Sequence, residues 1–132
     1  MIDFFYWPTP NGWKVSILLE ELGLPYKMHP VNIGKGDQFD PDFLKISPNN
    51  RMPAIIDHDV DGDPVSLFES GAILMYLGEK SNQFYDQKDR LKINQWLMAQ
   101  MGYVGPIIGQ HHQFHHYNPC LLYTSDAADE EE

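Results

Sequence analysis

The stretch that decides the fold is Asn49-Asn50-Arg51-Met52-Pro53-Ala54-Ile55-Ile56-Asp57, in which a proline stands directly before a short apolar run. Because Pro53 has no N–H to donate to a sheet ladder, it belongs at the first residue of a strand or in a tight turn. An X-Pro bond in a tight turn is the usual setting for a cis peptide. A cis bond before Pro53 would leave the Met52 N–H and C=O to hold an extended peptide, as another strand would.

A second apolar run follows this stretch and completes a hairpin. It is Val65-Ser66-Leu67-Phe68, and the turn Asp61-Gly62-Asp63 separates it from the first run. The acid-serine pair Glu69-Ser70 then opens a helical pattern over residues 70–80. At a helix start, these side chains could grip the amino and carboxylate groups of a peptide. The sequence therefore predicts a site for a small peptide with charged ends.

The residues before this hairpin predict two strand-helix pairs. Residues 2–7 and 26–31 have strand character, and the helix between them has Asn11 as its expected N-cap and Gly23 as its C-cap. Asp40 and Pro41 are typical of the N-cap and first position of a second, short helix. The resulting order, β-α-β-α-β-β-α, is that of a thioredoxin-like α/β domain, with a parallel strand pair first and an antiparallel hairpin second.

We expect this domain to occupy residues 1–81. A helical pattern begins again at Gln87 and predicts the start of an all-α domain over residues 82–118, which Gly102, Gly105-Pro106 and Gly109 should break or kink. Residues 119–132 end in Glu130-Glu131-Glu132 and read as a foreign or disordered acidic tail. The foreign interpretation, a translated linker attached to a truncated gene, is the one we favour.

Composition excludes several classes of protein. The chain has 132 residues, 42% of them apolar, and a net charge of −10 from 9 basic and 19 acidic residues, which argues against nucleic-acid binding. It has no long apolar stretch and no basic, apolar leader, so we expect neither a membrane span nor secretion. Its one cysteine, Cys120, excludes an internal disulfide, and a reducing cytoplasmic setting follows.

Two segments imitate metal sites. The run from Asp57 to Asp63 resembles the start of a calcium loop, but its twelfth position is Phe68 where a glutamate is needed, so an acidic hairpin turn explains it. The run His111-His112-Gln113-Phe114-His115-His116 has two i, i+4 histidine pairs. No cysteine or reliably placed carboxylate completes a site there, and we expect adventitious binding at most and no catalytic metal.

Four motifs together resemble the nu-class glutathione transferases, the bacterial disulfide-bond oxidoreductases related to the yeast nitrogen-regulation prion protein. The resemblance covers about residues 1–118. Pro-Thr-Pro-Asn-Gly separates this class from transferases that use a tyrosine, serine or cysteine. The motifs are Pro8-Thr9-Pro10-Asn11-Gly12, Gly34-Lys35-Gly36-Asp37-Gln38-Phe39, Ser47-Pro48-Asn49-Asn50-Arg51-Met52-Pro53-Ala54-Ile55 and Phe68-Glu69-Ser70-Gly71-Ala72-Ile73-Leu74.

The resemblance implies a thioredoxin-like domain that binds glutathione or oxidised glutathione, then an all-helical domain, in a homodimer. It implies catalytic roles for Thr9 and Asn11 beside the glutathione sulfur. Small disulfides or electrophiles would be the second substrate, in the cytoplasm and with no metal. The implied glutathione contacts are Asn11, Gln38, Arg51, Met52, Pro53, Glu69, Ser70 and Gln100.

The chemistry requires a thiolate, and the chain has no Cys-x-x-Cys and no cysteine near its first helix. The thiolate must therefore come from the ligand, with the Thr9 hydroxyl, the Asn11 amide and the helix N-terminus favouring its charged form. Tyr6 is the rival activator, although a core-strand aromatic usually packs. Arg51 and Lys14 could offset the ligand's carboxylates, with ordinary surface charge as the alternative for Arg51 and as the interpretation we favour for Lys14.

Two functions remain open on the residues alone. The first is glutathione-dependent reduction of small disulfides. The second is a non-catalytic protein that holds glutathione or a protein partner, which the yeast relative shows to be possible on this scaffold. Because the helical domain stops early, we expect the chain to expose apolar residues such as Leu97 and Ile107, and to be less stable and less active than a full-length relative.

Overall fold

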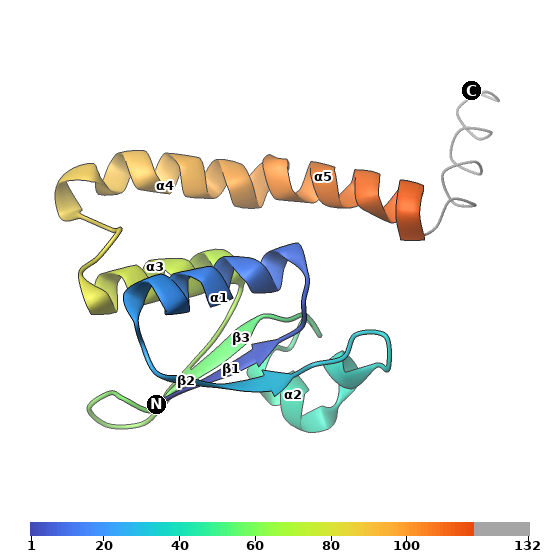
Figure 1. Cartoon of the computed structure of the whole chain (residues 1–132), viewed down its shortest axis with the longest axis horizontal. Helices are drawn as coiled ribbons and strands as arrows, with labels where there is room; N and C mark the ends of the chain where they lie inside the picture. Colours follow the sequence, from blue (N-terminus) through green and yellow to red (C-terminus); the bar gives the residue numbers. More distant parts are fainter. Residues whose placement is uncertain (118–132) are drawn as a thin grey trace. The chain divides into compact units, whose positions relative to one another are not determined.

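The computed structural model describes residues 1–117, and its centre is a four-stranded mixed sheet (Figure 1). The strands are β1 (Ile2–Tyr6), β2 (Tyr26–Pro30), β3 (Ala54–Asp57) and β4 (Val65–Phe68), in the spatial order β2-β1-β3-β4. β1 runs parallel to β2, with Phe4 opposite Met28, and antiparallel to β3, with Phe4 opposite Ile55. β3 and β4 form the antiparallel hairpin. The predicted thioredoxin-like fold is confirmed.

Helices cover both faces of this sheet. α1 (Pro10–Leu22) and α3 (Ser70–Ser81) lie together on one face, while α2 (Pro41–Ile46) and the 3₁₀ turn η1 (Asp37–Phe39) lie on the other (Figure 1). Alternation along β1 divides the core, because neighbouring side chains of a strand point to opposite faces. The main cluster is Ile2, Phe4, Val15, Leu19, Ile55, Ile73 and Leu77. The cluster beside α2 is Val31, Phe43, Met52 and Ala54, with Phe5 packed against it.

The helix ends follow the expected signals with one exception. Gly23 ends α1 in the left-handed conformation, at φ 64°, and Asp40 caps α2 with Pro41 at its first position, as predicted. The prediction that Asn11 caps α1 is wrong, because the helix begins at Pro10 and Thr9 is its N-cap. Pro10 suits the first helical position because its missing N–H would have no partner there, and this moves the capping role two residues upstream, from Asn11 to Thr9.

A buried ion pair ties β3 to the end of α3. The side chain of Asp57 is fully buried and lies 2.6 Å from Lys80 Nζ, and the Tyr76 hydroxyl donates to it at 2.6 Å. Burial alone would raise the pKa of Asp57, but the hydrogen bonds from Lys80 and Tyr76 outweigh it and leave this pKa below its ordinary value. Asp57 thus serves the fold, in keeping with the hairpin-turn interpretation of its segment.

A second compact unit begins at Arg90, after the 3₁₀ turn η2 (Gln87–Asp89). It contains α4 (Arg90–Ala99), the π-helical η3 (Gln100–Val104), α5 (Gly105–His112) and the π-helical η4 (Gln113–Tyr117). The chain does not break at Gly105-Pro106, because it stays helical with the Gly105 N–H bonded to the Gln100 carbonyl; a kink, the other predicted outcome, stays a prediction. Such an i→i+5 turn accommodates a proline that cannot donate.

The domain limits drawn from the sequence stay a prediction. Residues 82–89 group with the first unit, where Tyr85 is buried and the Gln83 N–H donates to the Gly78 carbonyl. The predicted tail over residues 119–132, with Cys120, lies outside the described residues. None of the helices within residues 1–117 is long and apolar enough to cross a membrane.

Candidate functional site

The site begins at the turn that leads from β1 into α1, where Thr9 makes two hydrogen bonds through its hydroxyl. Its backbone is extended, at φ −130° and ψ 161°, and its Oγ1 accepts a hydrogen bond from the Gly12 N–H at 3.2 Å. The same hydroxyl donates to the thioether sulfur of Met52, also at 3.2 Å. The first turn of α1 therefore meets the segment before β3 at a hydroxyl-sulfur contact.

Gly12 makes this close approach possible. A Cβ at this position would lie 2.4 Å from the Trp7 carbonyl oxygen, 2.8 Å from Met52 Cε and 2.9 Å from Tyr6 Cδ2. The nearest of these atoms belongs to the backbone and cannot swing aside as a flexible side chain can. A glycine is therefore required for α1 to begin directly over Met52.

The Met52–Pro53 peptide bond is cis, as the sequence predicts. Strand pairing begins immediately after it, since the β1–β3 register runs from Phe5 opposite Ala54. The Met52 main chain thus lies outside the ladder, while its side chain is only 8% exposed. The preceding turn is held by the Ser47 hydroxyl, which donates to the Arg51 carbonyl at 2.7 Å, and the Arg51 residue is exposed.

The start of α3 has an unusual backbone conformation. Glu69 precedes the helix at φ 74° and ψ 115°, although it is not a glycine, and its side chain caps nothing. Its carbonyl accepts the Ile73 N–H at 3.0 Å, and Ser70 beside it is buried. A charged residue at positive φ is uncommon and points to a functional constraint.

Lys14 connects the starts of α1 and α3 electrostatically. Burial lowers the pKa of this lysine below its ordinary value, and the negative charge of Glu69 opposes that fall. Lys14 is half-buried and close enough to Glu69 to interact with it. This placement differs from the ordinary surface charge that the sequence favoured for Lys14.

Gln38 holds a buried acceptor without a partner. It lies in η1, and its Nε2 donates to the Ile33 carbonyl at 3.3 Å. Its Oε1 is buried and has no hydrogen-bond partner within the part of the chain that the structure describes. A buried polar atom of this kind carries a cost that a ligand donor would remove.

A scaffold of this order, with a cis proline ahead of β3 and an acid-serine pair opening α3, matches a known family over most of the first unit. Residues 2–79 match the family described as glutathione S-transferase, N-terminal domain. The chain belongs to the glutathione S-transferase family.

Individual transferase relatives are similar over most of this chain. It is 51% identical over 126 residues to "Disulfide-bond oxidoreductase YfcG" of Escherichia coli (strain K12), a match that covers 92% of this chain and 59% of that protein. It is 38% identical over 128 residues to "Protein URE2" of Candida albicans (strain SC5314 / ATCC MYA-2876), covering 89% of this chain and 36% of that protein.

Solved transferase structures give the same result. The structure is similar, with a TM-score of 0.83 and 50% identity, to a Pseudomonas putida glutathione transferase with one glutathione disulfide bound per subunit; the match covers 88% of this chain and 52% of that one. A Pseudomonas fluorescens pf-5 family member with two glutathione bound matches with a TM-score of 0.84 and 52% identity, covering 87% and 52%. The chain spans 52% to 59% of the length of three of these relatives and 36% of the length of Protein URE2.

The transferase fold brings only part of the predicted site together. Thr9 and Met52 are in contact, and Pro53 follows Met52 directly. Asn11 is exposed on the first turn of α1, and Gln100 lies in the second unit, at the start of η3. The rival Tyr6 packs against the main core cluster, with its ring centroid 5.3 Å from that of Phe4.

Sequence reasoning missed two contributors, the Met52 side chain and Gly12. A glycine in the first turn of a helix is a signal of close backbone approach, so Gly12 could have been found. No sequence signal marks the Met52 thioether, since only its main chain was assigned a role.

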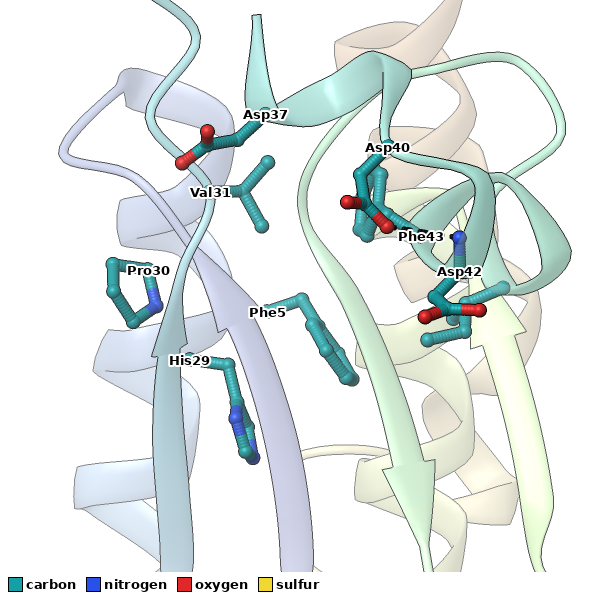
Figure 2. Close-up of a pocket in the computed structure, with 9 residues that line it drawn as sticks. Phe5, His29, Pro30, Val31, Asp37, Asp40, Asp42 and Phe43 are labelled. Atoms are coloured by element: carbon teal, nitrogen blue, oxygen red, sulfur yellow. Dashed lines mark hydrogen bonds between the residues drawn. The ribbon is translucent and has the colours of Figure 1, made fainter. Parts of the chain in front are cut away.

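A separate hollow of about 380 Å³ opens between β2 and α2 (Figure 2). Its floor includes the stacked rings of Phe5 and His29, whose centroids are 4.9 Å apart. None of the residues expected to contact glutathione is among those that line it. The lining residues are Phe5, His29, Pro30, Val31, Asp37, Asp40, Asp42, Phe43 and Ile46.

The histidine-rich segment pairs its rings at i, i+4 spacing, one pair stacked and the other tilted. The His111 and His115 centroids are 4.3 Å apart, and those of His112 and His116 are 4.6 Å apart. Within residues 1–117, no three His, Cys, Asp or Glu side chains form a group that could hold a metal ion.

Proposed function

We propose that this chain carries the glutathione-binding part of a glutathione-dependent disulfide-bond reductase, in which the bound tripeptide supplies the thiolate. The observation that carries the proposal concerns the Thr9 hydroxyl. It lies at the N-terminus of α1 and donates a hydrogen bond to a sulfur atom, that of Met52. The 51% identity to a disulfide-bond oxidoreductase supports it. So do the solved relatives that hold glutathione or glutathione disulfide.

Each residue of the proposed site would bind a different part of glutathione, beginning with its thiolate and its main chain. Thr9 and Asn11 would stabilise the glutathione thiolate, together with the positive end of the α1 dipole. The Met52 main chain, outside the β3 ladder, would pair with the extended peptide as a strand does.

The charged ends of the ligand would be held by other groups. Glu69 and Ser70 would bind the γ-glutamyl end, and Gln38 would contact the backbone of the tripeptide. Arg51 would offset a ligand carboxylate, and Gln100 stays a predicted glutathione contact.

The reaction follows from thiol-disulfide exchange. The bound glutathione thiolate attacks one sulfur of a small disulfide, forms a mixed disulfide and releases one thiol. A second glutathione thiolate then attacks the mixed disulfide, releases the second thiol and leaves glutathione disulfide. The protein supplies binding and electrostatics, and it needs neither a cysteine nor a metal of its own for these steps. We expect the enzyme to act in the cytoplasm, as a homodimer, and on electrophiles more weakly.

A non-catalytic, regulatory role is the alternative, and the 36% identity to a solved nitrogen regulation fragment of the yeast prion protein Ure2p supports it. The experiment that separates the two is glutathione-dependent reduction of 2-hydroxyethyl disulfide, measured beside calorimetric binding of glutathione disulfide. Turnover that Thr9→Ala and Asn11→Ala diminish supports the reductase. Binding without turnover supports the alternative.

A further inference from the structure

The Thr9 hydroxyl has one proton, and the structure shows where that proton goes. A hydroxyl carries one donor and two acceptor lone pairs. The Gly12 N–H donates to one lone pair of the Thr9 oxygen at 3.2 Å, so the hydroxyl proton points away from the helix. The hydroxyl in turn donates this proton in a hydrogen bond to the Met52 sulfur, also at 3.2 Å. Without a ligand, the proton that the proposed mechanism needs is therefore already in use.

The Met52 sulfur is held firmly in this place. The side chain is 8% exposed and packs in the cluster with Val31, Phe43 and Ala54. Its methyl group lies against the bare Cα of Gly12, where a Cβ would come within 2.8 Å of it. The thioether cannot withdraw easily when a ligand arrives.

We propose that the Met52 thioether is a built-in competitor for the Thr9 hydroxyl, and that it limits how strongly this site stabilises a bound thiolate. The inference rests on the proposed function, because it concerns the same thiolate. Met52 acts through Thr9, so it is a positioning residue whose sulfur sets the reactivity of the ligand's sulfur.

The competition between the two sulfur atoms for the Thr9 proton affects the pKa of the bound thiol in a definite direction. A thiolate is a charged acceptor and a thioether a weak neutral one, so the proton moves to the thiolate when glutathione binds. The bond to Met52 is lost in that exchange, and its loss subtracts from the stabilisation of the thiolate. A neutral hydrogen bond corresponds to about half a unit to one unit in the pKa of the bound thiol.

The test is Met52→Leu, which keeps an apolar side chain of similar volume and removes the acceptor. The pKa of the glutathione thiol bound to this variant, read from the ultraviolet absorbance of its thiolate, should fall by about half a unit to one unit. Met75→Leu, a change of the same type at a half-buried position of α3, should leave it unchanged. Met52→Gln is a second, independent test, in which the pKa should change in the opposite direction. The side-chain carbonyl of glutamine is a stronger acceptor than a thioether, so it should compete better for the Thr9 hydroxyl and raise the pKa of the bound thiol.

A double-mutant cycle ties the effect to the hydroxyl. In a Thr9→Val background the proton is gone, so adding Met52→Leu should no longer change the pKa of the bound thiol. An unchanged or higher pKa of the bound thiol in Met52→Leu overturns the inference. It is also overturned if Met52→Leu still lowers this pKa in the Thr9→Val background. If the wild-type chain binds glutathione but these variants do not differ, only this inference fails. If the wild-type chain binds none, the proposed function fails and this inference with it.

Discussion

The hydroxyl of Thr9 and the thioether sulfur of Met52 lie 3.2 Å apart, although 43 positions separate them in the chain. The contact joins the helix-initiating turn of α1 to the segment before β3, the two parts of the fold that the proposed function requires. It also gives Thr9 two roles, as the N-cap of α1 and as a donor to sulfur.

Replacing Thr9 should separate these roles. Thr9→Val removes the cap bond to the Gly12 N–H, which should lower the free energy of unfolding by about 1 kcal/mol. It also removes a charge-assisted bond to the thiolate, so disulfide reduction should fall about tenfold to a hundredfold. Denaturant melts and the 2-hydroxyethyl disulfide assay measure the two effects. Tyr6→Phe is the control; loss of activity in that variant alone would contradict the assignment of Thr9.

Gly12→Ala should damage the fold as well as the site. The added methyl would stand 2.4 Å from the Trp7 carbonyl oxygen, so α1 must shift away from Met52, at a cost of about 1–3 kcal/mol. The matched control is Gly109→Ala in α5, where a Cβ meets nothing within 4 Å and alanine should be neutral or stabilising. Equal melting temperatures for the two variants would show that the close approach at Gly12 is not required.

Glu69→Gly should raise stability while removing function. Its φ of 74° suits glycine better than glutamate, so the free energy of unfolding should rise by up to about 1 kcal/mol. The lost carboxylate should at the same time weaken glutathione binding, which calorimetry would detect. A variant that is both less stable and equally able to bind would argue against a functional constraint at this residue.

The order of the fold was predictable from local signals, because each acts over a few residues. Pro53 fixes where β3 begins, the turn Asp61-Gly62-Asp63 separates β3 from β4, and Gly23 ends α1. The prediction for Asn11 overlooked Pro10, which starts the helix two residues earlier than an Asn11 cap allows.

The finer geometry of the site could not be predicted in this way. The Met52 side-chain contact and the orphaned Oε1 of Gln38 depend on packing between segments that are distant in sequence. The helical path through Gly105-Pro106 likewise depends on a hydrogen bond shift to Gln100, which residue propensities do not encode.

The buried ion pair predicts a large effect at Lys80. Lys80→Met would leave the Asp57 carboxylate buried without its cation and should cost about 3 kcal/mol of stability, measured by denaturant unfolding. Lys45→Met is the matched control, since the Lys45–Asp42 pair is exposed and should contribute less than about 0.5 kcal/mol. Similar losses in both variants would be inconsistent with this account.

The same pair predicts how stability depends on pH. Because the pKa of Asp57 is lowered in the fold, its contribution is complete above its unfolded pKa of about 3.9 and is lost as pH falls toward the folded value. In Lys80→Met, burial dominates and should raise the pKa of Asp57. The stability difference between wild type and Lys80→Met should therefore begin to shrink above about pH 4, as pH falls through the raised pKa of Asp57 in the variant, and should go on shrinking down to the lowered pKa of Asp57 in the wild type. A difference that is constant across this range would contradict the assignment.

The central claim is that a thiol tripeptide binds beside the N-terminus of α1 and brings the reactive sulfur. Isothermal calorimetry of the folded chain with glutathione and with glutathione disulfide tests it most directly. The account predicts saturable heat from at least one redox form, which Glu69→Gly diminishes. A folded sample that gives no heat with either form would contradict it.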